Sequence, residues 1–199
     1  MFWTPKCWSF EEAAARPSAV RRLSLIKPDL AFDSFAALVP HLIKVREIEL
    51  GQQLWTELPE ALARLPELRS FAVLNTSIER FPAFLASCPR LTGLCLRGTE
   101  ITSIPPSVQA FRHLRRLDFS NNPTQEIPPE LGHLSELRFL QLGDLRLKTL
   151  PDSLANLRRL RTLALAGNCF SPDEAARIRS WFRRGVASVW SIDECHRPT

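Results

Sequence analysis

The stretch LRRLDFSNNPTQEIPPELGHLSE, residues 114–136, decides the fold because its pattern recurs along the chain. The segment before it, LTGLCLRGTEITSIPPSVQAFRH at 91–113, carries the same apolar positions and the same proline. Such prolines recur every 23 residues, each after an apolar residue, at Pro59, Pro82, Pro105, Pro128 and Pro151. A fixed period of this length indicates a protein built from stacked structural units.

Aligned on this step, units run over 45–67, 68–90, 91–113, 114–136 and 137–159, a further unit begins at Leu160, and a degenerate unit of 25 residues precedes them. Each unit reads L-x-x-L-x-L-x-x-(N/T)-x-L-x-x-L-P-x-x-L-x-x-L-x-x. This pattern resembles the leucine-rich-repeat family, in the L-P-x-x-L-x-x-L subtype common in bacterial and intracellular proteins. The resemblance covers residues 20–184.

The spacing of apolar residues explains how one unit folds. Positions 4 and 6 alternate as in a short strand and point into a core, whereas positions 3, 5 and 7 point outward. The proline can open a short helical or 3₁₀ turn, and positions 18 and 21 return apolar side chains to the same core. We therefore expect an α/β leucine-rich-repeat solenoid with a curved parallel sheet of seven strands on its concave side, short helices or 3₁₀ turns on its convex side, and helical caps.

We expect three regions: an N-terminal cap at 1–19, repeats at 20–170, and a C-terminal capping helix and tail at 171–199. Ser9 with Glu12 predicts a capping box at the start of the first helix, and Ser171 with Glu174 predicts a second one. Pro172 suits the first position of that second helix. Residues 187–192 can add a final strand. The sequence thus predicts a complete short solenoid between two caps.

Position 9 of each unit faces the turn after the strand. Asparagine is usual there, because its amide can bond to the backbone of the turn. This chain has Asn122 and Asn168 at that position, but Gln53, Thr76, Thr99 and Leu145 in the other units. Since leucine supplies no hydrogen bond, we expect the turn at 143–147 to be the least well held.

Charge and cysteine content bear on the compartment and on the partner. The formal net charge is +5, and of 26 basic residues only four are lysine, so arginine carries most of the charge. Five scattered cysteines, an odd number without a C-x-x-C pair, indicate free thiols in a reducing compartment. We expect a cytoplasmic protein with no secretory signal and no membrane-spanning segment.

The outward positions form the candidate binding surface. Leu74 and Phe139 are large apolar residues where solvent is expected, and charged residues lie between them, as in many protein contact sites. Position 2 is nearly a column of arginines, broken only by Thr92. The predicted partner-binding residues on the concave face are Glu47, Glu49, Leu74, Arg97, Arg116, Asp118, Phe139 and Gln141.

Catalytic and metal-binding patterns are missing from the sequence. The four histidines fall outside positions 3, 5 and 7, which form the columns of side chains on the concave face. No P-loop, G-x-G-x-x-G, H-E-x-x-H or G-x-S-x-G motif is present. Cys195 and His196 are adjacent in the tail but have no third group to orient them. Cys95 faces the concave side, where it is either a reactive thiol or a small side chain that only fills space. We predict no catalytic residues, no metal and no cofactor.

The sequence therefore predicts a non-catalytic scaffold, monomeric in solution, that binds a protein on its concave face and binds neither nucleic acid nor a membrane. Two alternatives stay open. Bacterial effector ubiquitin ligases resemble this chain in their repeats, which suggests a domain or adaptor that targets a separate catalytic subunit, since residues 185–199 are too few for a catalytic domain. The arginine column suggests weak binding of an acidic or nucleic-acid partner.

Overall fold

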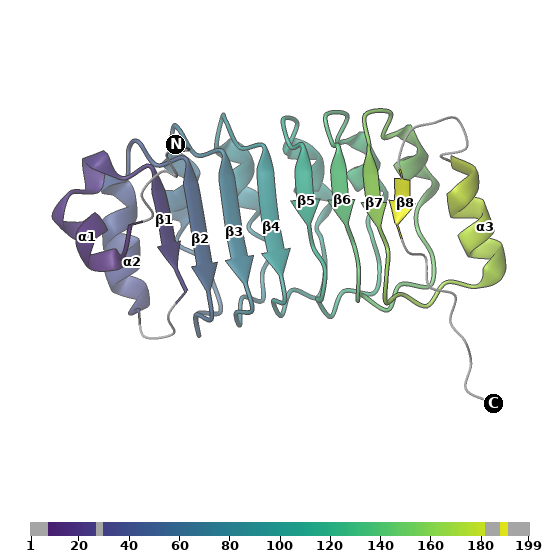
Figure 1. Cartoon of the computed structure of the whole chain (residues 1–199), viewed down its shortest axis with the longest axis horizontal. Helices are drawn as coiled ribbons and strands as arrows, with labels where there is room; N and C mark the ends of the chain where they lie inside the picture. Colours follow the sequence, from purple (N-terminus) through teal and green to yellow (C-terminus); the bar gives the residue numbers. More distant parts are fainter. Residues whose placement is uncertain (1–7, 27–29, 182–187, 191–199) are drawn as a thin grey trace, which may run out of the picture.

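The structure, a computed structural model, describes residues 8–26, 30–181 and 188–190. Its strands pair in chain order to form one open parallel sheet (Figure 1). The last of them lies in the segment where the sequence allowed a final strand, so the sheet has one strand more than the seven that the units alone predict. The strands are β1 (Arg22–Leu25), β2 (Glu47–Gly51), β3 (Ser70–Leu74), β4 (Gly93–Arg97), β5 (Arg116–Asp118), β6 (Phe139–Gln141), β7 (Thr162–Ala164) and β8 (Ser188–Trp190).

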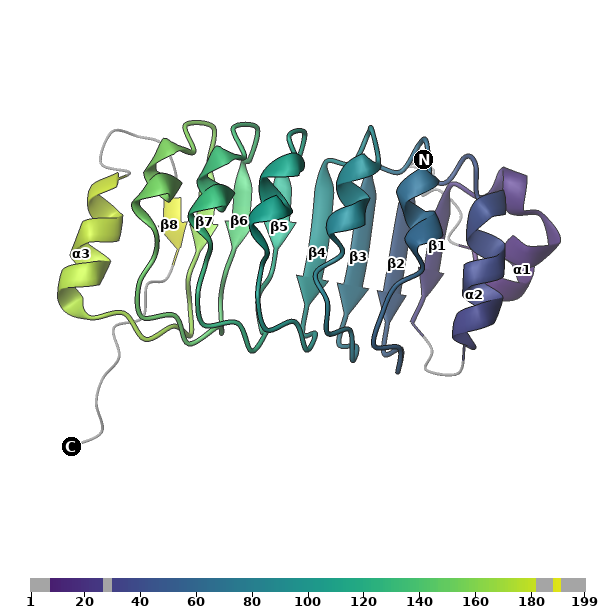
Figure 2. The same ribbon diagram turned by 180° about the vertical axis from the view of Figure 1, so that it is seen from behind.

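Helices and 3₁₀ helices cover the back of the sheet (Figure 2). Among the described residues, the opposite face of the sheet carries no helices (Figure 1). The first unit contains a true helix, and the regular units carry 3₁₀ turns. The helices are α1 (Phe10–Ala15), α2 (Phe32–Leu38) and α3 (Pro172–Trp181), and the 3₁₀ helices are η1 (Pro17–Ala19), η2 (Val39–His41), η3 (Glu60–Arg64), η4 (Ala83–Ser87), η5 (Pro106–Ala110), η6 (Pro129–His133) and η7 (Asp152–Asn156).

The core lies between the sheet and the turns behind it. Residues at positions 4 and 6, such as Leu117 and Phe119, are buried, and so are those at position 18, such as Leu131. Thr124, a polar residue at an otherwise apolar position, is also buried, because its hydroxyl donates to the carbonyl of Ile101 at 2.8 Å. The period therefore identifies the core residues, and the one polar exception has its own partner.

Position 8 of each regular unit adopts the left-handed backbone conformation, at Gln52, Asn75, Gly98, Asn121, Asp144 and Gly167. Asparagine, aspartate and glycine tolerate this conformation best. Two of these positions are linked to their neighbours. The side chain of Asn75 occupies the space that a Cβ on Gly98 would need, and Asp144 does the same at Gly167.

Asparagines at position 9 hold the turns of the unit before them as well as their own. The amide of Asn168 donates to the carbonyl oxygens of Leu142 at 2.7 Å and Leu165 at 2.8 Å. Its carbonyl oxygen accepts from the backbone N–H groups of Leu145 at 3.3 Å and Leu147 at 3.0 Å. The turn at 143–147 is thus held by the next unit, contrary to the expectation that it would be poorly held.

The N-terminal capping box is formed as predicted. The hydroxyl of Ser9 accepts from the backbone N–H of Glu12 at 3.4 Å, and the Glu12 carboxylate accepts from the backbone N–H of Ser9 at 3.2 Å. Trp8 pairs with Leu23 as an isolated parallel bridge on the outer edge of β1. Both features place residues over the first strand of the sheet, which would otherwise present a free edge.

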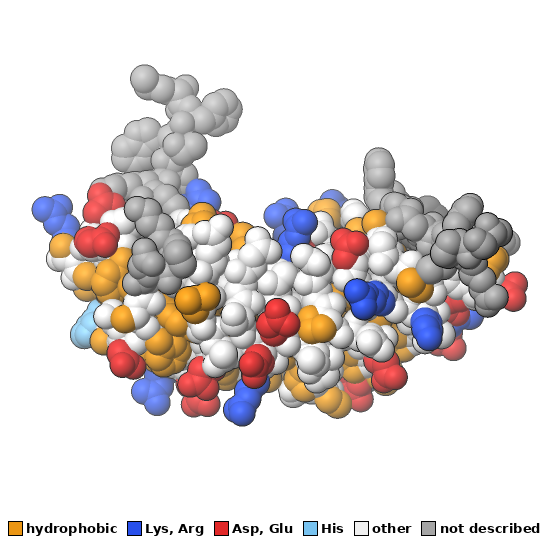
Figure 3. Space-filling view, turned by 90° about the horizontal axis from the view of Figure 1, so that it is seen from below, with side chains coloured by type: hydrophobic (Ala, Val, Ile, Leu, Met, Phe, Trp, Pro, Cys, Tyr) orange, Lys and Arg blue, Asp and Glu red, His pale blue; other side chains and the backbone are white. Residues whose placement is uncertain are grey.

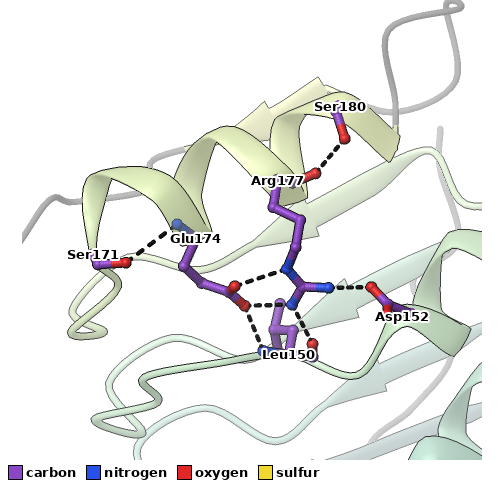
Figure 4. Close-up of polar contacts among 6 residues, drawn as sticks. All are labelled: Leu150, Asp152, Ser171, Glu174, Arg177 and Ser180. Atoms are coloured by element: carbon purple, nitrogen blue, oxygen red, sulfur yellow. Dashed lines mark hydrogen bonds and ion pairs between the residues drawn. The ribbon is translucent and has the colours of Figure 1, made fainter.

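The C-terminal helix is fastened differently from the prediction (Figure 4). The Ser171 hydroxyl accepts from the backbone N–H of Glu174 at 3.2 Å, which is half of a capping box. The Glu174 carboxylate, however, accepts from the backbone N–H of Leu150 at 2.8 Å and from the guanidinium of Arg177. Arg177 also donates to the Leu150 carbonyl at 2.6 Å and pairs with Asp152. These contacts, here called the C-terminal clasp, join α3 to the preceding unit.

Candidate functional site

The open face of the sheet carries the three predicted columns of side chains, at positions 3, 5 and 7. The pairing register aligns equal positions of successive units from β1 to β7, so residues of one column are neighbours across the sheet. All eight residues predicted to bind a partner lie on strands β2 to β6 and in these columns: Glu47, Glu49, Leu74, Arg97, Arg116, Asp118, Phe139 and Gln141.

The two acidic residues of β2 are bonded to the strand before them. Arg22 Nε lies 2.7 Å from a carboxylate oxygen of Glu47. The Ser24 hydroxyl donates to Glu49 at 3.2 Å. Both carboxylates already have partners within the sheet, so we expect this end of the face to attract a cationic partner weakly.

Four of the predicted residues form one group on adjacent strands. The register places Arg116 beside Phe139 and Asp118 beside Gln141. The guanidinium carbon of Arg116 lies 5.0 Å from the centroid of the Phe139 ring, within the range of a cation–π interaction. A carboxylate oxygen of Asp118 accepts from the backbone N–H of Ser120 at 3.0 Å, which fixes its orientation. This group is called the β5–β6 patch.

Leu74 and Phe139 are less exposed than the sequence predicted. Both are half-buried, because strands stack on each side of them and the Arg116 guanidinium lies over the Phe139 ring. Among the described residues, the large apolar side chains with the greatest exposure lie elsewhere: Leu54 at 77%, Ile43 at 50% and Ile26 at 48%. Leu54 stands at position 10, where the other regular units have serine, glutamate, proline, arginine or cysteine, and that contrast could have identified it.

The turns at the ends of the strands line a polar hollow that the columns at positions 3, 5 and 7 did not predict. Figure 3 views the molecule from this edge, where uncharged polar side chains and backbone cover much of the surface. The hollow measures about 430 Å³, and its lining includes Asn75, Glu100, Asn121, Asp144 and Arg146. The strand positions alone do not reveal this hollow, because these residues occupy positions 8 and 10.

Cys95 lies in the middle of the concave face, between Ala72 and Asp118 in the register. Burial of the thiol, and then the negative charge of Asp118, raise its pKa from 9.0 to about 12. A thiolate is the reactive form of cysteine, so this environment suppresses reactivity. Of the two interpretations of Cys95, the geometry favours a small side chain that only fills space.

This pKa has a measurable consequence. We expect iodoacetamide at pH 8 to modify Cys95 about fifty-fold more slowly in the folded protein than in urea, since the smaller thiolate fraction outweighs the greater nucleophilicity of a thiolate with a raised pKa. The rate should rise with pH until the pH approaches about 12, and Asp118→Asn should increase it. Peptide mass spectrometry after timed quenching gives the rate. Equal rates in the two states would contradict the assigned environment.

The shift also sets the direction of a pH effect on stability. The folded protein keeps the Cys95 proton at pH values where the unfolded chain has released it. The contribution of this thiol to stability is therefore complete below pH 9 and declines as the pH rises towards 12.

Groups that could perform other chemistry do not gather in the part of the chain that the structure describes. His41, His113 and His133 are exposed and lie off the concave columns. No set of three or more histidine, cysteine, aspartate or glutamate side chains among the described residues could hold a metal ion. Within the same residues, no helix has the length and hydrophobicity needed to cross a bilayer. Cys195 and His196 lie outside the described residues.

Comparison with known proteins agrees with the repeat pattern. A family model described as leucine rich repeat matches residues 112–170. No curated protein matches the sequence. Among solved structures, the chain is similar to a leucine-rich-repeat protein of Leptospira interrogans, with 29% identity and a TM-score of 0.71, over 77% of this chain and 39% of that one.

Two further structures share the fold. An internalin of Listeria monocytogenes is 16% identical, with a TM-score of 0.59 over 82% of this chain and 51% of that one. The ectodomain of the Arabidopsis thaliana receptor kinase GASSHO1/SCHENGEN3, in complex with CASPARIAN STRIP INTEGRITY FACTOR 2, is 27% identical, with a TM-score of 0.59 over 78% of this chain and 19% of that one. The chain thus spans about half or less of the length of each of these proteins.

Proposed function

Because this chain is a leucine-rich-repeat protein, we propose that it is a non-catalytic scaffold that binds another protein on its concave face. The fold is in general a protein–protein interaction module and is typically non-catalytic. The Arabidopsis ectodomain in complex with its factor supports recognition of a partner by such a fold. The identity of the partner follows from none of these likenesses.

The β5–β6 patch is the observation that carries this proposal. Arginine and aromatic side chains are enriched at the centres of protein interfaces. Here Arg116 and Phe139 are held against each other, so little side-chain freedom is lost when a partner covers them. Asp118 and Gln141 supply hydrogen-bonding groups beside the ring. Leu74 and Arg97, neighbours on β3 and β4, extend the same surface.

The double variant Leu74→Glu/Phe139→Glu tests the proposal. A partner is first captured with the native protein and purified, and its affinity is then measured by calorimetry. We expect the variant to bind at least about a hundredfold more weakly, because two carboxylates replace apolar contacts in the middle of the face. The matched control is Ala110→Glu/Ala155→Glu, which adds the same charge at exposed positions of η5 and η7. A folded concave variant that binds as tightly as the control would exclude the concave face.

We further propose that the protein is monomeric and acts in a reducing, cytoplasmic compartment. Support comes from the cysteines: Cys88, Cys95 and Cys169 are free thiols. Burial also raises the pKa of Cys88, to about 11, so this thiol resists oxidation. Sedimentation equilibrium of the reduced protein tests the monomer.

A further inference from the structure

The edge where the strands begin, at the top of Figure 1, carries the column of arginines at position 2. Backbone hydrogen bonds connect successive members of this column. The N–H of Thr92 donates to the carbonyl of Arg69 at 2.9 Å, and the N–H of Arg115 donates to the carbonyl of Thr92 at 2.8 Å. Neighbouring members are therefore one strand apart, about 4.8 Å. Its members are Arg21, Arg46, Arg69, Thr92, Arg115, Arg138 and Arg161.

A hollow of about 640 Å³ opens at the single interruption of this column, Thr92. Threonine is much shorter than arginine, and its hydroxyl donates to the Arg69 carbonyl at 3.3 Å rather than reaching outward. Arg69 and Arg115 lie on either side, and the turns behind the strands add Arg90, Arg112 and His113 to the lining. This hollow is called the Thr92 hollow.

The acidic groups near the Thr92 hollow already have partners. Glu67 forms a salt bridge of 2.7 Å with Arg90. Glu136, which also lines the hollow, forms a salt bridge with Arg159. Arg69, Arg112 and Arg115 are exposed, and none of them forms an ion pair with a residue in the described ranges. Three cationic side chains thus line the Thr92 hollow without an ion-pair partner of their own among the described residues. Their mutual repulsion lowers stability, and an anionic ligand would relieve it.

We propose that the Thr92 hollow binds an acidic polypeptide segment with at least two carboxylates. Arg69 and Arg115 begin two strands apart, a separation of about 9.6 Å. Alternate side chains of an extended peptide lie about 6.8 Å apart on one face, so two carboxylates can reach both arginines. A single phosphoryl group is smaller than that separation. Guanidinium groups also bind carboxylates in a bidentate manner, which suits a column of arginine rather than lysine.

This surface lies on the edge of the sheet and is separate from the concave columns. The inference rests on the proposed function only in that the ligand is a polypeptide. Variants of the concave face should leave it unaffected, so the two proposals can fail independently.

The test measures binding of a fluorescein-labelled Glu–Ser repeat peptide to the purified full chain by anisotropy at low ionic strength. Its Gln–Ser counterpart, inorganic phosphate and a single-stranded DNA are the comparison probes. Arg69→Gln/Arg112→Gln/Arg115→Gln removes the three unpaired charges. Arg64→Gln/Arg80→Gln/Arg158→Gln makes the same change in net charge at exposed arginines outside the hollow. Thr92→Arg fills the hollow while adding a positive charge.

We expect the glutamate peptide to bind in a salt-sensitive manner, the glutamine peptide not to bind, and the triple variant of the hollow to bind about tenfold more weakly. The control triple variant should lose clearly less affinity for the glutamate peptide. Thr92→Arg is the decisive variant, since it should weaken binding if the peptide enters the hollow and strengthen binding if diffuse charge alone attracts it. The concave variant Leu74→Glu/Phe139→Glu should bind the peptide unchanged.

Stronger binding by Thr92→Arg, equal losses in the two triple variants, or no binding of the glutamate peptide would overturn the inference. Preferential binding of phosphate or DNA that depends on the three arginines would overturn the ligand class. Circular dichroism of each variant confirms that the comparison is made between folded proteins.

Discussion

Replacing Asn168 with alanine should lower the free energy of unfolding by about 4 kcal/mol, because it leaves four buried backbone groups without their partner. The side chain is only 3% exposed, and it bonds two carbonyl oxygens and two N–H groups in two successive units. Water cannot replace these bonds without opening the turn at 143–147. Urea unfolding followed by circular dichroism and tryptophan fluorescence gives the free energy and its m-value.

Two companion variants make this prediction specific. Asn168→Thr keeps one hydroxyl, which can accept from a backbone N–H of its own turn as the Thr99 hydroxyl accepts from Ile101 at 3.4 Å, and it should cost about half as much stability. Asn156→Ala removes an exposed asparagine at the end of η7 and should change stability by less than about 0.5 kcal/mol. If Asn168→Ala were no more destabilising than Asn156→Ala, the asparagine would not hold the turn as described.

Gly132→Ala should destabilise the protein by about 3 kcal/mol, although the repeat pattern predicts the opposite. Alanine stands at the same position in other units, at Ala63, Ala86 and Ala155, and it favours a helical turn more than glycine does. A Cβ on Gly132 would, however, overlap the backbone carbonyl of Ser153 and lie 2.6 Å from the Cβ of Ser153. Backbone on both sides leaves nothing that can rotate away, so η6 and η7 must separate.

The control for this substitution is Gly93→Ala on β4. There the added Cβ would lie 3.3 Å from the Ser70 hydroxyl oxygen, which belongs to a side chain that can turn aside. We expect a change of less than about 1 kcal/mol. Separation of η6 and η7 would also break the bond of 2.6 Å from the Ser153 hydroxyl to the Pro129 carbonyl. Thermal unfolding of the two variants side by side measures the difference, and equal midpoints would refute the steric explanation.

The repeat period was sufficient to predict which residues face the core and which form the concave columns. A step of 23 residues fixes both the register and the side of the sheet on which each side chain lies, so Arg116 and Phe139 could be placed side by side in advance. Contacts between side chains of successive units could not be predicted in the same way. The bonds of Asn168 to the turn at 143–147 depend on the direction in which the amide points, which the spacing does not specify.

Local sequence motifs likewise predicted only part of the side-chain contacts. Ser171 and Glu174 have the spacing of a capping box, but the carboxylate is drawn to Leu150 and Arg177, because a buried N–H and a guanidinium of adjoining segments compete with the helix end. Likewise, the exposure of Phe139 depended on Arg116, which the alternation of a strand does not reveal. Competition between local and neighbouring partners is decided only when the units are stacked.

The paired side chains at position 8 bear on how such a protein can change over evolution. A solenoid with one register looks as though any unit could be deleted, duplicated or exchanged on its own. Asn75 occupies the space above Gly98, and Asp144 occupies the space above Gly167, so a unit that brought another residue to either glycine position would meet the side chain of its neighbour. In these parts of the chain, recombination should succeed in blocks of two adjacent units rather than one.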